Sequence, residues 1–170
     1  VRRELLPAIK ALAVRAKARN IGLTIDAEEA ERLELSMGLI EALATDHELV
    51  GWNGLGLAIQ AYQKRALPLL DWLADLAHRG QRRLLVRLCK GAYWDAEIKI
   101  AQERGHADYP VFTRKVTSDV SYLACARRLF SDPQAFYPAF ATHNAHTLAA
   151  VAEIAISSGG SDEWEYQRLH

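Results

Sequence analysis

The sequence predicts an α/β protein built around a parallel β-sheet. Short apolar runs recur along the chain, and one or two segments with apolar residues at helical spacing separate each run from the next. Strands that alternate with helices form βαβ units, in which successive strands lie parallel. Half of the 170 residues are apolar and 25% are charged, which is the composition of a folded domain. We expect one domain over residues 1–170.

Each element is predicted from its own apolar pattern. Apolar residues three and four positions apart indicate amphipathic helices, whereas short continuous apolar runs bounded by turn residues indicate buried strands. The helix after the first strand is expected to begin at Asp26, because Glu28 and Glu29 supply the acidic first turn that a helix N-terminus favours. The predicted elements, in chain order, are a helix over 4–18, a strand over 21–25, a helix from 26 to about 45, a strand over 55–59, a helix over 67–76, a strand over 83–89, helices over 95–104 and 114–130, a strand over 136–141, a helix over 145–157 and a strand over 164–169.

Two closures of this sheet are compatible with the element order. One is an open, doubly wound sheet, and the other is an arc of a (β/α)8 barrel. A complete barrel typically has about 250 residues, so this chain would form only a portion of one. Neither a G-x-G-x-x-G motif nor a P-loop follows the first predicted strand, which disfavours a dinucleotide-binding open sheet.

Composition argues against several classes of protein. The chain has 21 Lys and Arg and 21 Asp and Glu, so no net charge attracts it to nucleic acid. No apolar run approaches the roughly 20 residues of a membrane span. Cys89 and Cys125 are too few for a disulfide framework, which predicts a reducing, cytoplasmic location. The chain begins at Val1 without an initiator Met or a signal-peptide core, so we expect a piece of a longer protein.

Polar side chains fall at or just past the carboxyl ends of the predicted strands. In parallel α/β folds this is the end at which ligand and catalytic sites assemble. The residues at these positions are Asp26, Gln60, Arg87, Lys90, Thr142 and His143.

Arg87 is the most informative of these residues, because it interrupts an apolar strand. If Val86 and Leu88 face the helices, the alternation of a strand places Arg87 on the opposite face. A guanidinium removed from water needs an acidic or anionic partner. The functional interpretation of Asp26 is a carboxylate that holds a neighbouring arginine or accepts a proton. The alternatives are a purely structural ion pair for Arg87 and a helix N-cap for Asp26.

The loop after the third strand joins a cation to small and aromatic residues. Gly91 follows Lys90, and such a bend lets backbone N–H groups approach an anion. Tyr93 and Trp94 offer flat rings that could stack on a planar cofactor. The alternatives are an ordinary Lys-Gly turn and core aromatic rings, and Gln60 could simply satisfy a backbone group.

The sequence lacks the residue patterns of a metal site, a serine hydrolase and a glycosidase. His143 and His146 are spaced for a shared metal on a helix, but no third ligand is near, so we predict no metal site. No G-x-S-x-G supports a serine hydrolase, and no second strand-end carboxylate joins Asp26 for a glycosidase. The remaining set of donors, cations and aromatic rings suits an anionic planar cofactor.

Several long stretches carry a specific resemblance to a known family. Together they resemble the proline dehydrogenase domain of bacterial proline utilization A proteins, in one register over nearly the whole chain. The resemblance implies a (β/α)8 barrel with non-covalent FAD that oxidises L-proline to 1-pyrroline-5-carboxylate and passes electrons to a membrane quinone. It also implies a bifunctional, cytoplasmic parent chain with an aldehyde dehydrogenase domain, which can lie at the inner membrane face. The matching stretches are 25–29, 60–65, 83–99, 109–115 and 140–148.

The resemblance also implies roles for individual residues. Arg87 resembles the arginine at the reactive N5 edge of the flavin, and Asp26 resembles its carboxylate partner, so these two are the catalytic candidates. Gln60 resembles a hydrogen-bond donor to the flavin ring, and Tyr93 a wall near the proline ring. The predicted FAD contacts are Ala27, Gln60, Arg87, Lys90, Gly91, Ala92, Trp94, Thr142 and His143.

Two parts of the family pattern fall outside this sequence. The first barrel strand, with a substrate-binding lysine, would precede Val1, and the last strands and helices, with the paired arginines for the proline carboxylate, would follow His170. We therefore expect residues 1–170 to be the central part of the barrel domain, with no nucleic-acid contact of its own. The alternatives are a fragment without independent activity and a related barrel flavoenzyme acting on hydroxyproline.

Overall fold

The computed structural model describes residues 2–159 and 163–169. They form one five-stranded sheet in which each strand pairs in parallel with the next strand of the sequence. The strands are β1 (Leu23–Ile25), β2 (Leu55–Gln60), β3 (Leu84–Cys89), β4 (Phe136–Ala141) and β5 (Glu165–Gln167).

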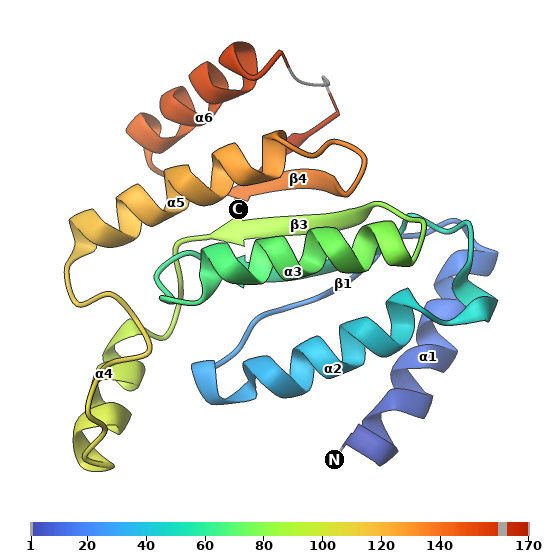
Figure 1. The fold of residues 1–170 in the computed structure, drawn as a ribbon, viewed down its shortest axis with the longest axis horizontal. Coiled ribbons are helices and arrows are strands. Elements are labelled where there is room, and N and C mark those ends of the chain that lie inside the picture. Colours follow the sequence, from blue (N-terminus) through green and yellow to red (C-terminus); the bar gives the residue numbers. More distant parts are fainter. Residues whose placement is uncertain (1, 160–162, 170) are drawn as a thin grey trace.

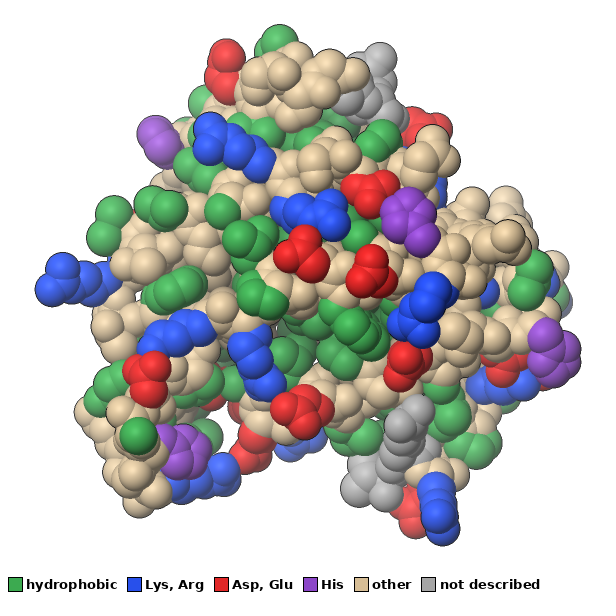
Figure 2. Space-filling view, in the orientation of Figure 1, with side chains coloured by type: hydrophobic (Ala, Val, Ile, Leu, Met, Phe, Trp, Pro, Cys, Tyr) green, Lys and Arg blue, Asp and Glu red, His purple; other side chains and the backbone are tan. Residues whose placement is uncertain are grey.

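Helices connect consecutive strands, and α1, α2, α3, α5 and α6 pack on one another in that order. Figure 1 shows α2, α3 and α5 along the same side of the sheet. The exposed surface on this side carries both signs of charge among apolar side chains (Figure 2). The helices are α1 (Arg2–Ala18), α2 (Leu33–Ala44), α3 (Ala66–Arg79), α4 (Trp94–Glu103), α5 (Lys115–Phe130) and α6 (Ala145–Ser157), with the short 3-10 helices η1 (Ala30–Arg32) and η2 (His47–Leu49).

The strand order decides between the two predicted closures. Right-handed crossovers between strands in sequential order place every helix on one face of the sheet. A doubly wound sheet instead reverses its order at a switch point and has helices on both faces. The order β1-β2-β3-β4-β5 is that of a barrel arc, and the five described strands do not close into a complete barrel.

The core lies between the sheet and the helices, and β3 shows the alternation that the sequence predicts. Leu84, Val86 and Leu88 are completely buried against the helices, whereas Arg87 and Cys89 are only partly buried on the opposite face. The prediction that Arg87 points away from the helices is confirmed. We call the face that carries Arg87 the inner face of the sheet.

The prediction that Asp26 begins a helix is wrong. The first helical turn is η1 at Ala30, and α2 begins only at Leu33. Ile25 packs on the helix-facing core, so the next residue, Asp26, alternates to the inner face, where its carboxylate pairs with Arg87 and caps no helix. Residues 26–29 therefore form a loop. In the part of the chain that the structure describes, no helix is long and apolar enough to cross a bilayer.

Candidate functional site

Arg87 lies near the carboxyl end of the inner face and forms an ion pair with Asp26. Its register neighbours are Ala58 on β2 and Ala139 on β4. Because both neighbours are small, the long guanidinium side chain has room over the sheet. The arginine side chain is 31% exposed and the aspartate side chain 71%, so the pair is open to solvent on one side.

A second acceptor for Arg87 comes from β5. Gln167 Oε1 accepts a hydrogen bond from Arg87 Nε at 2.6 Å. The sequence prediction gave this glutamine no role, because the predicted strand ran to residue 169, whereas β5 ends at Gln167, and the strand-end rule therefore passed over it. The guanidinium is thus held at Nε and at one terminal nitrogen.

A cavity of about 670 Å³ opens beside Arg87 and is lined in part by the residues after β4. Thr142 and His143 reach this cavity because they directly follow the end of the strand. His143 Nε2 accepts a hydrogen bond from the backbone N–H of Leu169 at 3.3 Å. The neutral imidazole therefore carries its proton on Nδ1. The structure brings the predicted residues Arg87, Thr142 and His143 to one cavity, with Asp26 in contact with it through Arg87.

Lys90, Gly91 and Trp94 line a second cavity, of about 340 Å³, between the loop after β3 and the start of α5. The Lys90 ammonium donates to Asp119 Oδ1 at 2.5 Å, and the Trp94 indole N–H donates to the Phe112 carbonyl at 2.9 Å. The predicted site residues therefore fall into two groups at the same end of the sheet.

Gly91 is fixed by its contact with Tyr62. Its φ is +137°, and a Cβ atom at this position would lie 2.5 Å from the Tyr62 ring. The Tyr62 hydroxyl accepts a hydrogen bond from the backbone N–H of Tyr93 at 3.3 Å. Burial raises the pKa of the Tyr62 phenol, so this hydroxyl remains protonated. Tyr62 is a scaffold residue for the loop that the sequence prediction did not identify.

Gln60 links the loop after β1 to the loop after β3. Its side chain is buried, its Nε2 donates to the Glu28 carbonyl at 2.7 Å, and its Oε1 accepts from the Ala92 N–H at 3.0 Å. These bonds agree with the interpretation that Gln60 satisfies backbone groups, and its contact with FAD stays a prediction. Ala27 lies half-buried in the first of these two loops.

Glu97 is a buried carboxylate that sequence reasoning missed. It lies in the first turns of α4, and its Oε1 accepts a hydrogen bond from the Ala30 N–H at 2.5 Å. The bond ties α4 to the segment that follows Asp26. The sequence signal was weak, because an acidic residue near a helix N-terminus is also typical of an exposed first turn.

Cys89 ends β3, two residues after Arg87 and on the same face of the strand. Burial raises the pKa of its thiol to about 11, so the thiol is protonated near neutral pH. Across residues 2–159 and 163–169, no three His, Cys, Asp or Glu side chains gather in a way that could hold a metal ion.

Polar groups at the carboxyl end of a barrel-type sheet define a ligand-binding α/β protein, and comparison with known proteins gives the family. Residues 3–170 match the proline dehydrogenase family. The whole chain is 56% identical to the bifunctional protein PutA of Salmonella typhimurium and 55% identical to that of Escherichia coli, and it covers 13% of each. It also superposes on a crystal structure of a proline utilization A (PutA) variant from Bradyrhizobium japonicum, with a TM-score of 0.94 and 54% identity over the whole chain and 17% of that chain.

The chain belongs to the proline dehydrogenase family, as the resemblance predicted. It spans about one-eighth of the length of the curated PutA relatives that it matches.

Proposed function

We propose that this chain forms the FAD-binding part of an enzyme that oxidises L-proline to 1-pyrroline-5-carboxylate. The observation that carries the proposal is the Arg87 guanidinium at the edge of the larger cavity, held by Asp26 and Gln167. Its second terminal nitrogen, Nη2, has no hydrogen-bond partner among the described residues. This nitrogen is therefore free to donate to a bound group.

The residues present fit a flavin dinucleotide. Arg87, Thr142 and His143 supply a cation, a hydroxyl and an imidazole on one cavity, whose 670 Å³ lies within the usual range for cofactor pockets. Lys90 and Trp94 on the second cavity would suit the anionic arm of the cofactor and an aromatic contact. We assign the remaining FAD contacts to Ala27, Gln60, Gly91 and Ala92.

Each site residue has a role in this proposal. Bound FAD would supply the redox chemistry by accepting a hydride, that is two electrons and one proton, from the C–H bond of the ring carbon next to the proline nitrogen, while the nitrogen gives up a second proton as the C=N bond forms. The positive charge of Arg87 stabilises negative charge that develops beside it. Asp26 orients the guanidinium, and Tyr93 forms a wall for the proline ring.

The wider reaction is proposed from the relatives, which are bifunctional PutA proteins. In the full-length protein we expect residues 1–170 to be the central part of the proline dehydrogenase barrel. We also expect an aldehyde dehydrogenase domain to take the product and a membrane quinone to take the electrons. The location that follows is the cytoplasm, with contact at the inner membrane face.

The test is an anaerobic titration of the purified full-length protein with L-proline. The flavin absorbance should be present and should bleach on addition of L-proline. N-Propargylglycine, which inactivated a Bdellovibrio bacteriovorus PutA that is 30% identical to this chain, should inactivate the enzyme. A protein without flavin, or a flavin that proline leaves oxidised, would overturn the proposal.

Hydroxyproline is the second candidate substrate. A bovine hydroxyproline dehydrogenase is 33% identical over 112 residues, which is 65% of this chain. The same titration with hydroxyproline separates the two candidates, and we expect kcat/KM to be higher for proline. The reverse order would favour the hydroxyproline enzyme.

A further inference from the structure

We propose that Gln167 and Glu165 on β5 position Arg87 and preserve its positive charge for the cofactor. The inference rests on the proposed function, because it assigns residues that act on the flavin through Arg87. It starts from a chain of hydrogen bonds along the inner face. Of the residues in this chain, only Asp26 and Arg87 were site candidates predicted from the sequence.

The chain of contacts crosses the inner face from β1 to β5. Asp26 pairs with Arg87, and Arg87 Nε donates to Gln167 Oε1 at 2.6 Å. Gln167 Nε2 then donates to Glu165 Oε1 at 2.6 Å, and Glu165 Oε2 accepts from the Tyr137 hydroxyl at 3.4 Å. Each polar group therefore holds the next one in place.

Glu165 fixes the orientation of the Gln167 amide. A guanidinium can only donate hydrogen bonds, and a carboxylate can only accept them. Gln167 lies between one of each, so only one orientation satisfies both neighbours: its oxygen faces Arg87 and its nitrogen faces Glu165. The other orientation would place N–H groups against the guanidinium and two acceptors against each other.

The neutral amide at position 167 also controls the charge of the site. Among the residues that the structure describes, Arg87 has one carboxylate partner, Asp26, whose side chain is 71% exposed and therefore screened by water. A carboxylate at position 167 would lie about 2.6 Å from Arg87 Nε, as the amide oxygen does now. It would add a second negative charge beside the guanidinium, next to that of Asp26. Arg87 would then stabilise a negative charge on the flavin less well.

The small neighbours of Arg87 make these contacts necessary. Ala58 and Ala139 flank the arginine in register and offer it no polar group. Without the acceptor at position 167, only the exposed Asp26 would direct the guanidinium. We therefore classify Gln167 as a positioning residue for Arg87 and Glu165 as the residue that sets the Gln167 amide.

The test is a redox titration of FAD in the full-length Gln167→Glu enzyme. We expect the equilibrium to shift toward oxidised flavin by about tenfold, which is about 30 mV for a two-electron couple. The control is Gln134→Glu, which adds the same charge at an exposed position before β4 and should leave the titration unchanged.

Gln167→Met keeps the side-chain length, removes the acceptor and keeps the inference testable if Gln167→Glu does not fold. It should shift the redox equilibrium in the same direction and lower kcat about tenfold while KM for proline changes little. If wild-type flavin is reduced by proline but both variants titrate as wild type does, this inference is overturned and the proposed function stands. If proline does not reduce the wild-type flavin, the proposed function itself fails.

Discussion

Asp26 and Arg87 form an ion pair across a strand that lies between them. They are 61 residues apart in the sequence, Asp26 directly after β1 and Arg87 on β3, and β2 separates these two strands in the sheet. The bridge is possible because the β2 residue in register with Arg87 is Ala58, whose methyl group leaves the space above the strand open. The ion pair therefore depends on the small size of Ala58, although the Ala58 side chain makes no polar contact with either partner.

Replacing Ala58 with Leu should break this bridge. A leucine side chain would fill the space between the two partners, and we expect an overpacking cost of about 1–3 kcal/mol together with at least a tenfold loss of kcat. The free energy of unfolding and the steady-state rate check the two effects. The control is Ala58→Ser, which adds one atom and should retain most of the activity. A fully active Ala58→Leu enzyme would contradict the proposed role of the pair.

Asp26→Asn should separate function from stability. The pair is partly exposed, so its loss should change the free energy of unfolding by no more than about 1 kcal/mol. The flavin reduction rate should fall about tenfold or more, because the neutral amide orients the Arg87 guanidinium less firmly than the carboxylate does. Chemical denaturation and stopped-flow reduction measure the two quantities. If the variant loses stability but keeps the wild-type rate of flavin reduction, the Asp26–Arg87 pair has only a structural role.

Gly91→Ala tests the contact between the loop and Tyr62. The new Cβ atom would lie 2.5 Å from the aromatic ring, so the loop must move, and we expect a large loss of FAD affinity. The control is Gly105→Ala, where φ is also positive, at +63°, but nothing lies within 4 Å of the added atom. That variant should lose only about 1–2 kcal/mol of stability and no FAD affinity. Equal FAD titrations for both variants would contradict the account of the loop.

Glu97→Ala should destabilise the protein, because it leaves the buried Ala30 N–H without an acceptor. We expect a loss of about 1–3 kcal/mol in the free energy of unfolding. Glu97→Gln keeps an acceptor oxygen and should therefore retain most of the wild-type free energy of unfolding. The exposed Glu103→Ala on the same helix should change stability by less than about 0.5 kcal/mol. Denaturant unfolding of the three variants measures these free energies. If Glu103→Ala destabilises the protein as much as Glu97→Ala does, the structural role of the Glu97–Ala30 hydrogen bond is refuted.

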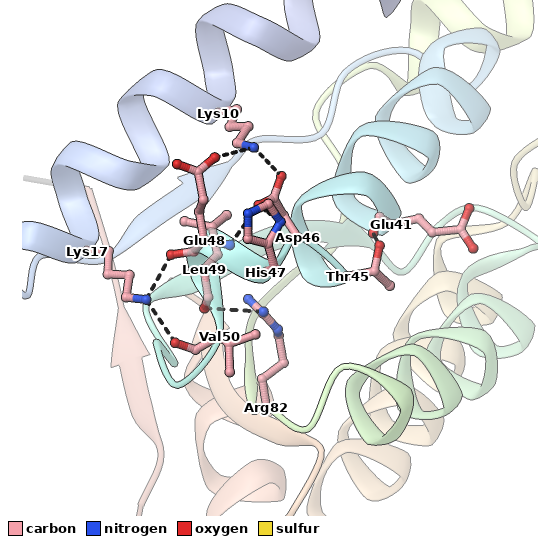
Figure 3. A network of polar contacts seen from close by, with 10 residues as sticks. All are labelled: Lys10, Lys17, Glu41, Thr45, Asp46, His47, Glu48, Leu49, Val50 and Arg82. Atoms are coloured by element: carbon pink, nitrogen blue, oxygen red, sulfur yellow. Dashed lines mark hydrogen bonds and ion pairs between the residues drawn. The ribbon is translucent and has the colours of Figure 1, made fainter.

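The attachment of α1 should weaken in acid. Lys10 on this helix bonds to Asp46 at 2.7 Å and to Glu48, while Lys17 donates to the carbonyls of Glu48 and Val50 (Figure 3). The Lys10 hydrogen bond holds the pKa of Asp46 below its ordinary value. A depressed carboxyl pKa contributes stability above its unfolded value, near 4, and that contribution is lost as pH falls through the folded pKa.

We therefore expect Asp46→Asn to have a lower Tm than the wild type at pH 7 and to approach it below about pH 3. Lys10→Met should reproduce the difference, because it removes the cause of the shift. Lys99→Met, which removes an exposed pair on α4, serves as the control and should show little pH dependence. A Tm difference for Asp46→Asn that is constant with pH would show that the ion pair is not its source.

The sequence predicted the fold well because the helices and strands have strong local patterns. The alternation in β3 placed Arg87 on the inner face, and α6 begins and ends as predicted, at Ala145 and Ser157. The failure at Asp26 has a tertiary cause. Local acidic residues favoured a helix start there, but the ion pair with Arg87, which lies 61 residues away, uses the same carboxylate.

The candidate site was only partly predictable for the same reason. Strand-end position selected Arg87 and His143, which line one cavity. It could not show that Lys90 faces a separate cavity, because the direction of a loop depends on packing, here against Tyr62. It also could not reveal Glu97, whose partner is a backbone N–H from a distant segment.

A crystal structure of the full-length protein with bound FAD tests the central claim most directly. The account predicts the flavin ring in the cavity lined by Arg87, Thr142 and His143, with a guanidinium nitrogen of Arg87 about 3 Å from flavin N5. Asp26 and Gln167 should still hold that guanidinium. A flavin bound elsewhere on the sheet, or one whose N5 lies beyond hydrogen-bond reach of Arg87, would contradict it.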